Sequence, residues 1–140
     1  MAIQIQNGMT LLQVFDMPTA IKFYCDLLGF EVVNTSETLP NGSFHWAMLQ
    51  LSGVHLMLNT AYESDDERPP VADKARNAAH EDTIIYFQCP DVDAAYNHLQ
   101  NRGVDVKPPS VAYYGMKQLY VTDPDGFGLC FQWPANSAVG

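Results

Sequence analysis

Two stretches of the chain follow the same order of predicted elements, and this internal repeat constrains the fold more than any other feature. Residues 10–32 read as an apolar strand, Asp16, a helix, Gly29 and a second strand, and residues 83–106 repeat that order with Asp91 and Gly103. Polar residues at the start of a helix and glycine just past its end are its usual boundary signals. A repeat of this kind indicates a duplicated supersecondary unit.

Each repeat continues into a predicted pair of strands. Residues 44–58 turn at Ser52-Gly53, and residues 117–132 turn at Asp125-Gly126. Each half therefore reads βαβββ, which predicts an α+β fold. With 140 residues, the chain has the length of one domain. We expect a single domain over residues 1–140, with a first module at about 9–58, a linker or lid at 59–82 that contains a short helix in ADKARNAA, and a second module at about 83–134.

Strand alternation sorts the predicted strand residues onto two faces. One face is almost wholly apolar and suits the core: Leu12, Val14, Val54, Leu56, Leu58, Ile85, Phe87, Phe127, Leu129 and Phe131, packed under Ile21, Phe23, Tyr24 and Leu27 of the first helix. The other face mixes apolar and polar side chains: Met9, Leu11, Gln13, His55, Met57, Asn59, Ile84, Tyr86, Gln88, Cys130 and Gln132. Such a mixture is typical of small-molecule pockets, so we predict these eleven residues as ligand contacts.

Composition excludes several classes of partner. The net charge of -9 repels phosphate backbones and anionic lipids, so neither nucleic acid nor a membrane surface is expected to bind. No apolar run approaches a membrane span, and the N-terminal residues lack a signal-peptide pattern. The three cysteines show no CxxC spacing, which favours a reducing compartment, so we expect a cytoplasmic location.

The motifs of both repeats resemble those of the vicinal oxygen chelate superfamily, which includes glyoxalase I, bleomycin-resistance proteins and extradiol dioxygenases. The resemblance rests on VFDMPTAIKFYCDLLGFEV, on PDVDAAYNHLQNRGVDV and above all on VTDPDGFGLCF, and it covers nearly the whole chain. It implies that the paired βαβββ modules form a cupped sheet of eight strands. It also implies a small-molecule ligand in the cup and, often, a homodimer.

The same resemblance implies four positions for metal ligands. Metal-dependent members carry histidine seven residues before the aspartate that precedes each helix, and glutamate on the last strand of each module. Here those positions hold Met9 and Ile84, and Met57 and Cys130. Zinc, nickel, iron and manganese centres in such a fold use imidazole and carboxylate ligands, whereas the thioether and thiol of Met9, Met57 and Cys130 suit a soft ion such as Cu(I), and isoleucine binds no metal. Plain packing of these methionine and cysteine side chains is favoured over a copper site. We therefore expect no metal and no other cofactor.

Three functional classes remain open from the sequence. The first is a binding protein that holds a mostly apolar or aromatic molecule in a metal-free cup. The second is an enzyme, either a metal-dependent lyase like glyoxalase I or a dioxygenase-like oxidoreductase, whose displaced metal site uses His55 with help from His45, His80 or Glu81. The third is a regulatory partner-binding module. Cys130 lies between core residues without a basic neighbour, which predicts an inert thiol, and no catalytic residue is assigned.

Overall fold

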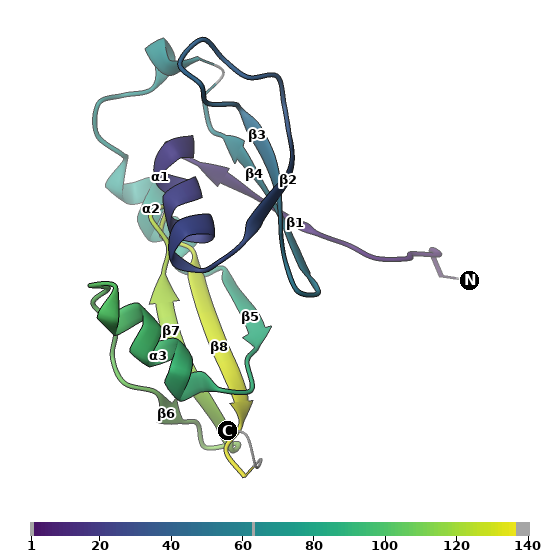
Figure 1. Cartoon of the computed structure of the whole chain (residues 1–140), viewed down its shortest axis with the longest axis vertical. Coiled ribbons are helices and arrows are strands. Elements are labelled where there is room, and N and C mark those ends of the chain that lie inside the picture. Colours follow the sequence, from purple (N-terminus) through teal and green to yellow (C-terminus); the bar gives the residue numbers. More distant parts are fainter. Residues whose placement is uncertain (1, 63, 137–140) are drawn as a thin grey trace. The chain divides into compact units, whose positions relative to one another are not determined.

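A computed structural model describes residues 2–62 and 64–136 of the chain, in two compact units. The first unit covers Met1–Val71 and the second covers Ala72–Gly140. Each unit holds one four-stranded sheet and one βαβββ module (Figure 1). The predicted α+β class and the paired βαβββ modules are confirmed.

The first unit is a mixed sheet covered by one helix. Its elements are β1 (Thr10–Val14), α1 (Met17–Ile21), which continues as the π-helix η1 (Lys22–Leu27), β2 (Glu31–Thr35), β3 (Trp46–Leu51), β4 (Val54–Thr60) and the short 3-10 helix η2 (Asp65–Glu67). The strand order is β1-β4-β3-β2, with β1 parallel to β4 and the other pairs antiparallel. The predicted turn at Ser52-Gly53 joins β3 to β4.

The helix of the first unit begins as predicted but presents a different face to the core. Asp16 caps it, because its side chain accepts a hydrogen bond from the Thr19 N–H at 3.1 Å. Its fully buried side chains are Met17, Ala20 and Tyr24, whereas the predicted core residues Ile21, Phe23 and Leu27 are only half-buried. Met17, Ala20 and Tyr24 are spaced three and four residues apart, so they form one stripe of an ordinary helical period, and the predicted set was centred on a neighbouring stripe.

The second unit repeats this plan with an additional helix. Its elements are α2 (Lys74–His80), β5 (Ile84–Gln88), α3 (Val92–Asn101), β6 (Ser110–Val111), β7 (Met116–Thr122) and β8 (Gly128–Pro134). The strand order is β5-β8-β7-β6, and β5 is parallel to β8. Helix α3 packs on β7 and β8 (Figure 1), where Leu119, Val121 and Leu129 are buried, and Phe87 of β5 is buried as well. No helix among the described residues is long and apolar enough to cross a membrane.

The DPDG turn at residues 123–126 joins β7 to β8 through one buried carboxylate. Asp123 is 4% exposed, and its Oδ1 accepts hydrogen bonds from the N–H groups of Asp125 at 2.8 Å and Phe127 at 2.9 Å. The Asp123 N–H also donates to the Phe127 carbonyl oxygen at 2.9 Å. Aspartate and asparagine side chains stabilise tight turns in this way, because they accept hydrogen bonds from backbone N–H groups that the turn leaves unpaired.

Helix α2, the short helix expected within residues 59–82, is fixed on this turn. Arg76 forms a largely buried ion pair with Asp125 at 2.9 Å, and His80 Nδ1 lies 2.7 Å from the Asp125 carbonyl oxygen. The His80 ring stacks on Phe127 with centroids 4.0 Å apart. The C-terminal half of the predicted linker or lid is therefore held on the DPDG turn of the second unit rather than left as a solvated loop.

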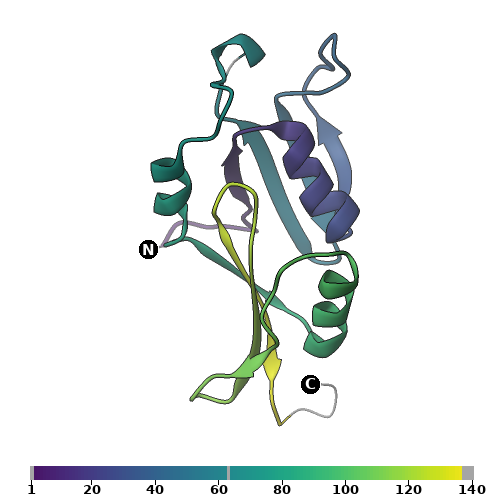
Figure 2. The same ribbon diagram turned by 90° about the vertical axis from the view of Figure 1, so that its left-hand side faces the viewer.

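One predicted strand is wrong. The repeat placed a strand directly after Gly103, at residues 104–106, but the chain forms no regular structure there, and β6 begins only at Ser110. Pro108 and Pro109 explain the difference, because proline has no N–H to donate to a strand ladder. In Figure 1 and Figure 2 the segment between α3 and β6 bows away from β7 before it joins the sheet.

The DPDG turn gives a direct test of this packing. Gly126 has a φ of 91°, and a Cβ there would collide with the Asn77 carbonyl oxygen, whereas Gly42 has a φ of 85° and open space around it. Gly42→Ala carries only the backbone cost of a positive φ, about 1 kcal/mol of unfolding free energy. Gly126→Ala adds the clash, a further ~1–3 kcal/mol. Urea denaturation measures both, and equal losses would contradict the close approach of α2.

Candidate functional site

The face of the second sheet opposite α3 carries a row of aligned tyrosine and glutamine side chains. Pairing across β5, β8 and β7 places Tyr86 and Tyr120 on either side of Cys130. The same register places Gln88 and Gln118 on either side of Gln132. Side chains that pair in register point to the same face, so these six form one continuous surface.

Two tyrosines from separate strands meet over the central cysteine. The hydroxyl oxygens of Tyr86 and Tyr120 lie 3.2 Å apart, although β8 runs between their strands. Both tyrosines are about half-exposed, at 46% and 47%, whereas Cys130 is 0% exposed. The two rings therefore lean toward each other across β8 and cover the thiol.

The environment of this trio favours the protonated forms of Cys130 and Tyr120. Burial raises the pKa of the Cys130 thiol, and a hydrogen bond with Tyr120 lowers it only in part. The hydrogen bond with Tyr86, together with burial and the nearby thiol, raises the pKa of Tyr120 well above its usual range. A nucleophilic cysteine needs the opposite, a lowered pKa and access to solvent. The trio offers an aromatic surface with hydroxyl donors and acceptors.

A glutamine extends the hydrogen-bond network along β7. Gln118 is 6% exposed, and its Nε2 donates to the Tyr114 hydroxyl at 2.7 Å and to Gln132 Oε1 at 3.0 Å. Its Oε1 accepts from the Tyr120 hydroxyl at 3.3 Å. Because every polar atom of this amide has a partner, the network holds Tyr120 and Tyr114 in defined positions.

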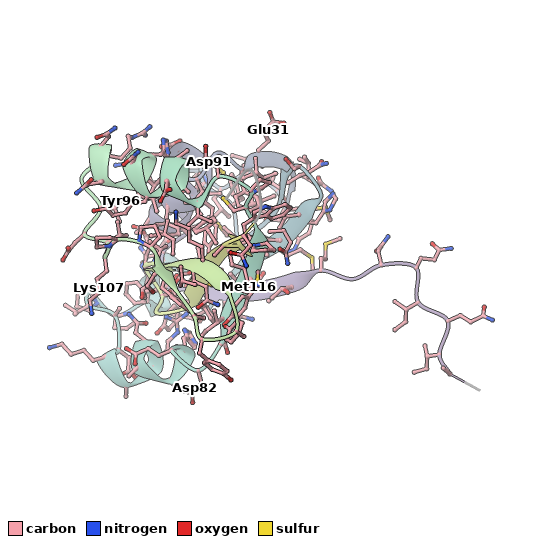
Figure 3. All side chains as sticks on the ribbon, turned by 90° about the horizontal axis from the view of Figure 1, so that it is seen from below. Glu31, Asp82, Asp91, Tyr96, Lys107 and Met116 are labelled. Atoms are coloured by element: carbon pink, nitrogen blue, oxygen red, sulfur yellow. The ribbon has the colours of Figure 1, made fainter. Side chains whose placement is uncertain are left out.

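A cavity of about 540 Å³ lies beside this network, along the outer edge of β7. It is lined by Gln118, Tyr120, Val121 and Thr122 of β7, by Ser110 of β6 and by Val104, Asp105, Val106, Lys107 and Pro108 of the bowed segment. In Figure 3, Lys107 on the bowed segment and Met116 at the start of β7 lie well apart. The volume is within the range of small-molecule sites, about 300–1,000 Å³. Gln118 and Tyr120 belong to both the cavity and the network.

The first unit carries the other predicted contacts on one face of its sheet. Leu11 pairs with Met57, and Gln13 pairs with Asn59, through the parallel ladder of β1 and β4. Met57 in turn pairs with Met48 of β3. Leu11 is 42% exposed and Met9 is 40% exposed, so this face is accessible and largely apolar. Methionine suits surfaces that adapt to irregular ligands, because its side chain is flexible and polarizable.

The histidines considered for a displaced metal site lie in unlike environments. His55 is exposed on β4 opposite Gln50, and His45 Nδ1 lies 3.2 Å from the Thr60 hydroxyl. His80 is held by the DPDG turn in the other unit. Within residues 2–62 and 64–136, no three histidine, cysteine, aspartate or glutamate side chains are grouped so that they could hold a metal ion.

Sequence reasoning missed two central residues of this site, Gln118 and Tyr120. It assigned residues 117–122 to a strand but did not sort them onto faces. The signal was available, because Gln118 and Tyr120 alternate with the buried Leu119 and Val121. The cavity had no sequence signal beyond the Pro108-Pro109 pair, since the strand expected before it was wrongly placed.

The two βαβββ modules define a class of protein, and comparison with known proteins identifies the family. A model of the Glyoxalase/Bleomycin resistance protein/Dioxygenase superfamily matches residues 7–131, so the chain belongs to this superfamily. The uncharacterized protein YaeR of Escherichia coli (strain K12) is 31% identical over 118 residues, which cover 81% of this chain and 84% of that protein.

Solved structures of the same fold include two proteins whose names refer to antibiotics. TnmS3, an antibiotic binding protein from Streptomyces sp. CB03234, is 25% identical with a TM-score of 0.65, and the match covers 96% of this chain and 98% of that one. A bleomycin resistance determinant encoded on the transposon Tn5 is 18% identical with a TM-score of 0.66, covering 93% and 98%.

The covered thiol gives a test of the tyrosine pair. Burial raises the pKa of Cys25 and Cys89 as well, but both side chains are partly exposed. We expect iodoacetamide at pH 8 to label Cys130 at least about tenfold more slowly than either, because its thiol is both protonated and covered. Tyr86→Ala removes half of the cover and should speed the labelling of Cys130, whereas Tyr96→Ala on α3 should not. Mass spectrometry of the labelled peptides measures the three rates, and equal rates in the unmodified protein would contradict the geometry.

Proposed function

We propose that this protein binds a small, mostly apolar or aromatic molecule against the second sheet. The observation that carries the proposal is the shared position of Gln118 and Tyr120, which line the cavity and also belong to the hydrogen-bonded network. A bound molecule there contacts an aromatic ring and apolar side chains while the hydroxyl and amide groups orient its polar atoms. Small-molecule sites combine apolar lining with a few fixed polar groups in this way.

The network is better suited to binding than to bond-breaking chemistry. Two of its groups, Cys130 and Tyr120, have raised pKa values and stay protonated at neutral pH. General bases and nucleophiles are activated in the other direction, toward a pKa near the working pH or below it. The same reasoning favours the binding hypothesis over a lyase or dioxygenase with a displaced metal at His55, since that side chain has no grouped partners among the described residues.

The relatives support the same reading. TnmS3 is named an antibiotic binding protein, and the Tn5 protein is named a bleomycin resistance determinant. A net charge of -9 is compatible with a cationic ligand. We further propose a cytoplasmic location, which the three free cysteines support. A homodimer is also proposed, on the family resemblance alone. The remaining predicted contacts on the first sheet, Met9, Leu11, Gln13, His55, Met57 and Asn59, stay predictions.

A fragment screen tests the proposal. Ligand-observed NMR with a library of neutral and cationic aromatic fragments should identify fragments that bind the protein and compete for a single site. Tyr120→Ala should weaken these hits at least about tenfold, or about 1.4 kcal/mol, because it removes the ring shared by cavity and network. Tyr113→Ala is the matched control, since the Tyr113 side chain is fully exposed. Hits that are unaffected by Tyr120→Ala, or an absence of hits, would refute a binding site on this sheet.

A further inference from the structure

We propose that the outer edge of β7 binds an extended, amide-bearing molecule, a peptide or peptide-like compound, by pairing with the backbone of Tyr120 and Thr122. This inference rests on the proposed function, because it names the class of ligand that the cavity beside β7 takes. It follows from the direction of the backbone groups along β7, from the residues opposite them and from the shape of the space between.

The ladder with β8 determines which backbone groups of β7 face outward. The Asp123 N–H donates to the Phe127 carbonyl oxygen at the start of the hairpin. Backbone groups alternate in direction along an antiparallel strand, so those of Leu119 and Val121 face β8, and those of Tyr120 and Thr122 face the outer edge. The ladder with β6 agrees, because the Ala112 N–H donates to the Met116 carbonyl oxygen at 2.8 Å, and Met116 is in phase with Tyr120.

A proline interrupts the strand that would otherwise cover these groups. Ser110 pairs with Gln118, so the same register would set Pro108 opposite Tyr120. Pro108 has no N–H to donate to the Tyr120 carbonyl oxygen, and the segment before it leaves the sheet. In the described part of the chain, no backbone group pairs with the outer side of Tyr120 or Thr122. The 540 Å³ cavity occupies the place of the missing strand.

The spacing of the exposed groups selects an extended amide chain. Tyr120 and Thr122 each present one N–H and one carbonyl oxygen, about 7 Å apart along the strand. An extended peptide repeats its own donors and acceptors at the same interval, so it can pair with both residues. The open edge from Leu119 to Thr122 is about 10 Å long, which accommodates about three ligand residues. The apolar side chains of Val104 and Val106 form the opposite wall, where alternate ligand side chains can pack.

Amide hydrogen exchange of the full-length ¹⁵N-labelled protein tests the pairing. In the free protein, the Tyr120 and Thr122 amides should exchange at least about 100-fold faster than those of Leu119 and Val121, which are bonded to β8. A saturating mixture of N-acetyl tripeptide amides built from Val, Leu, Phe and Tyr should slow the first two at least about tenfold. The same mixture with methylated backbone nitrogens should not, because it lacks the donors.

Two neighbouring prolines supply a matched pair of variants. Pro108→Ala restores an N–H opposite the Tyr120 carbonyl oxygen, so β6 should lengthen, protect the Tyr120 amide without peptide and weaken peptide binding about tenfold. Pro109→Ala should change neither, because an N–H at that position points away from β7 in the same register. Equal behaviour of the two variants would contradict the assigned role of Pro108.

The outcomes separate this inference from the proposed function. If the peptides leave Tyr120 and Thr122 unprotected while aromatic fragments still depend on Tyr120, the peptide inference is wrong and the binding site stands. If neither class binds, both are wrong. Protection of the two amides in the free protein also overturns the inference, and protection that grows with protein concentration would identify a second copy of this chain as the partner of the edge.

Discussion

The hairpin register set by the DPDG turn is the constraint on which the second unit depends. Asp123 satisfies two backbone donors of the turn while its own N–H starts the ladder, so β8 has one alignment with β7. A slip of one residue would exchange the two faces of β8. Leu129 and Phe131 would then replace Cys130 and Gln132 beside the tyrosines and glutamines. The aligned rows of the candidate site thus follow from a single buried carboxylate.

The same turn also explains why a polar segment between the modules is ordered. Asp125 is 2% exposed, and Arg76 and His80 of α2 reach it from the preceding segment. A buried carboxylate without such partners would be costly, so the turn and the helix stabilise each other. Gly126 allows the helix backbone to approach closely. The segment between the modules therefore contributes to the second unit instead of only connecting two halves.

The sequence predicted what depends on local patterns, and it failed where long-range contacts decide. Period-two alternation placed Leu12, Leu56 and Leu129 in the core correctly, and the turn residues located both hairpins. The π-helical turn after Ile21 had no signal in the apolar spacing. The contact between Tyr86 and Tyr120 requires the strand order β5-β8-β7, because the two residues lie on strands that do not touch. Likewise, the docking of His80 on Phe127 depends on tertiary packing that a polar, alanine-rich stretch does not reveal.

The central claim is that a ligand binds beside β7, in contact with Tyr120 and Gln118. A crystal structure of the protein grown with its tightest-binding aromatic fragment tests this claim most directly. The account predicts ligand density in the cavity between β7 and residues 104–108, enclosed by side chains and without a coordinated ion. Density held by a metal at His55, or density that contacts neither Tyr120 nor Gln118, would contradict it.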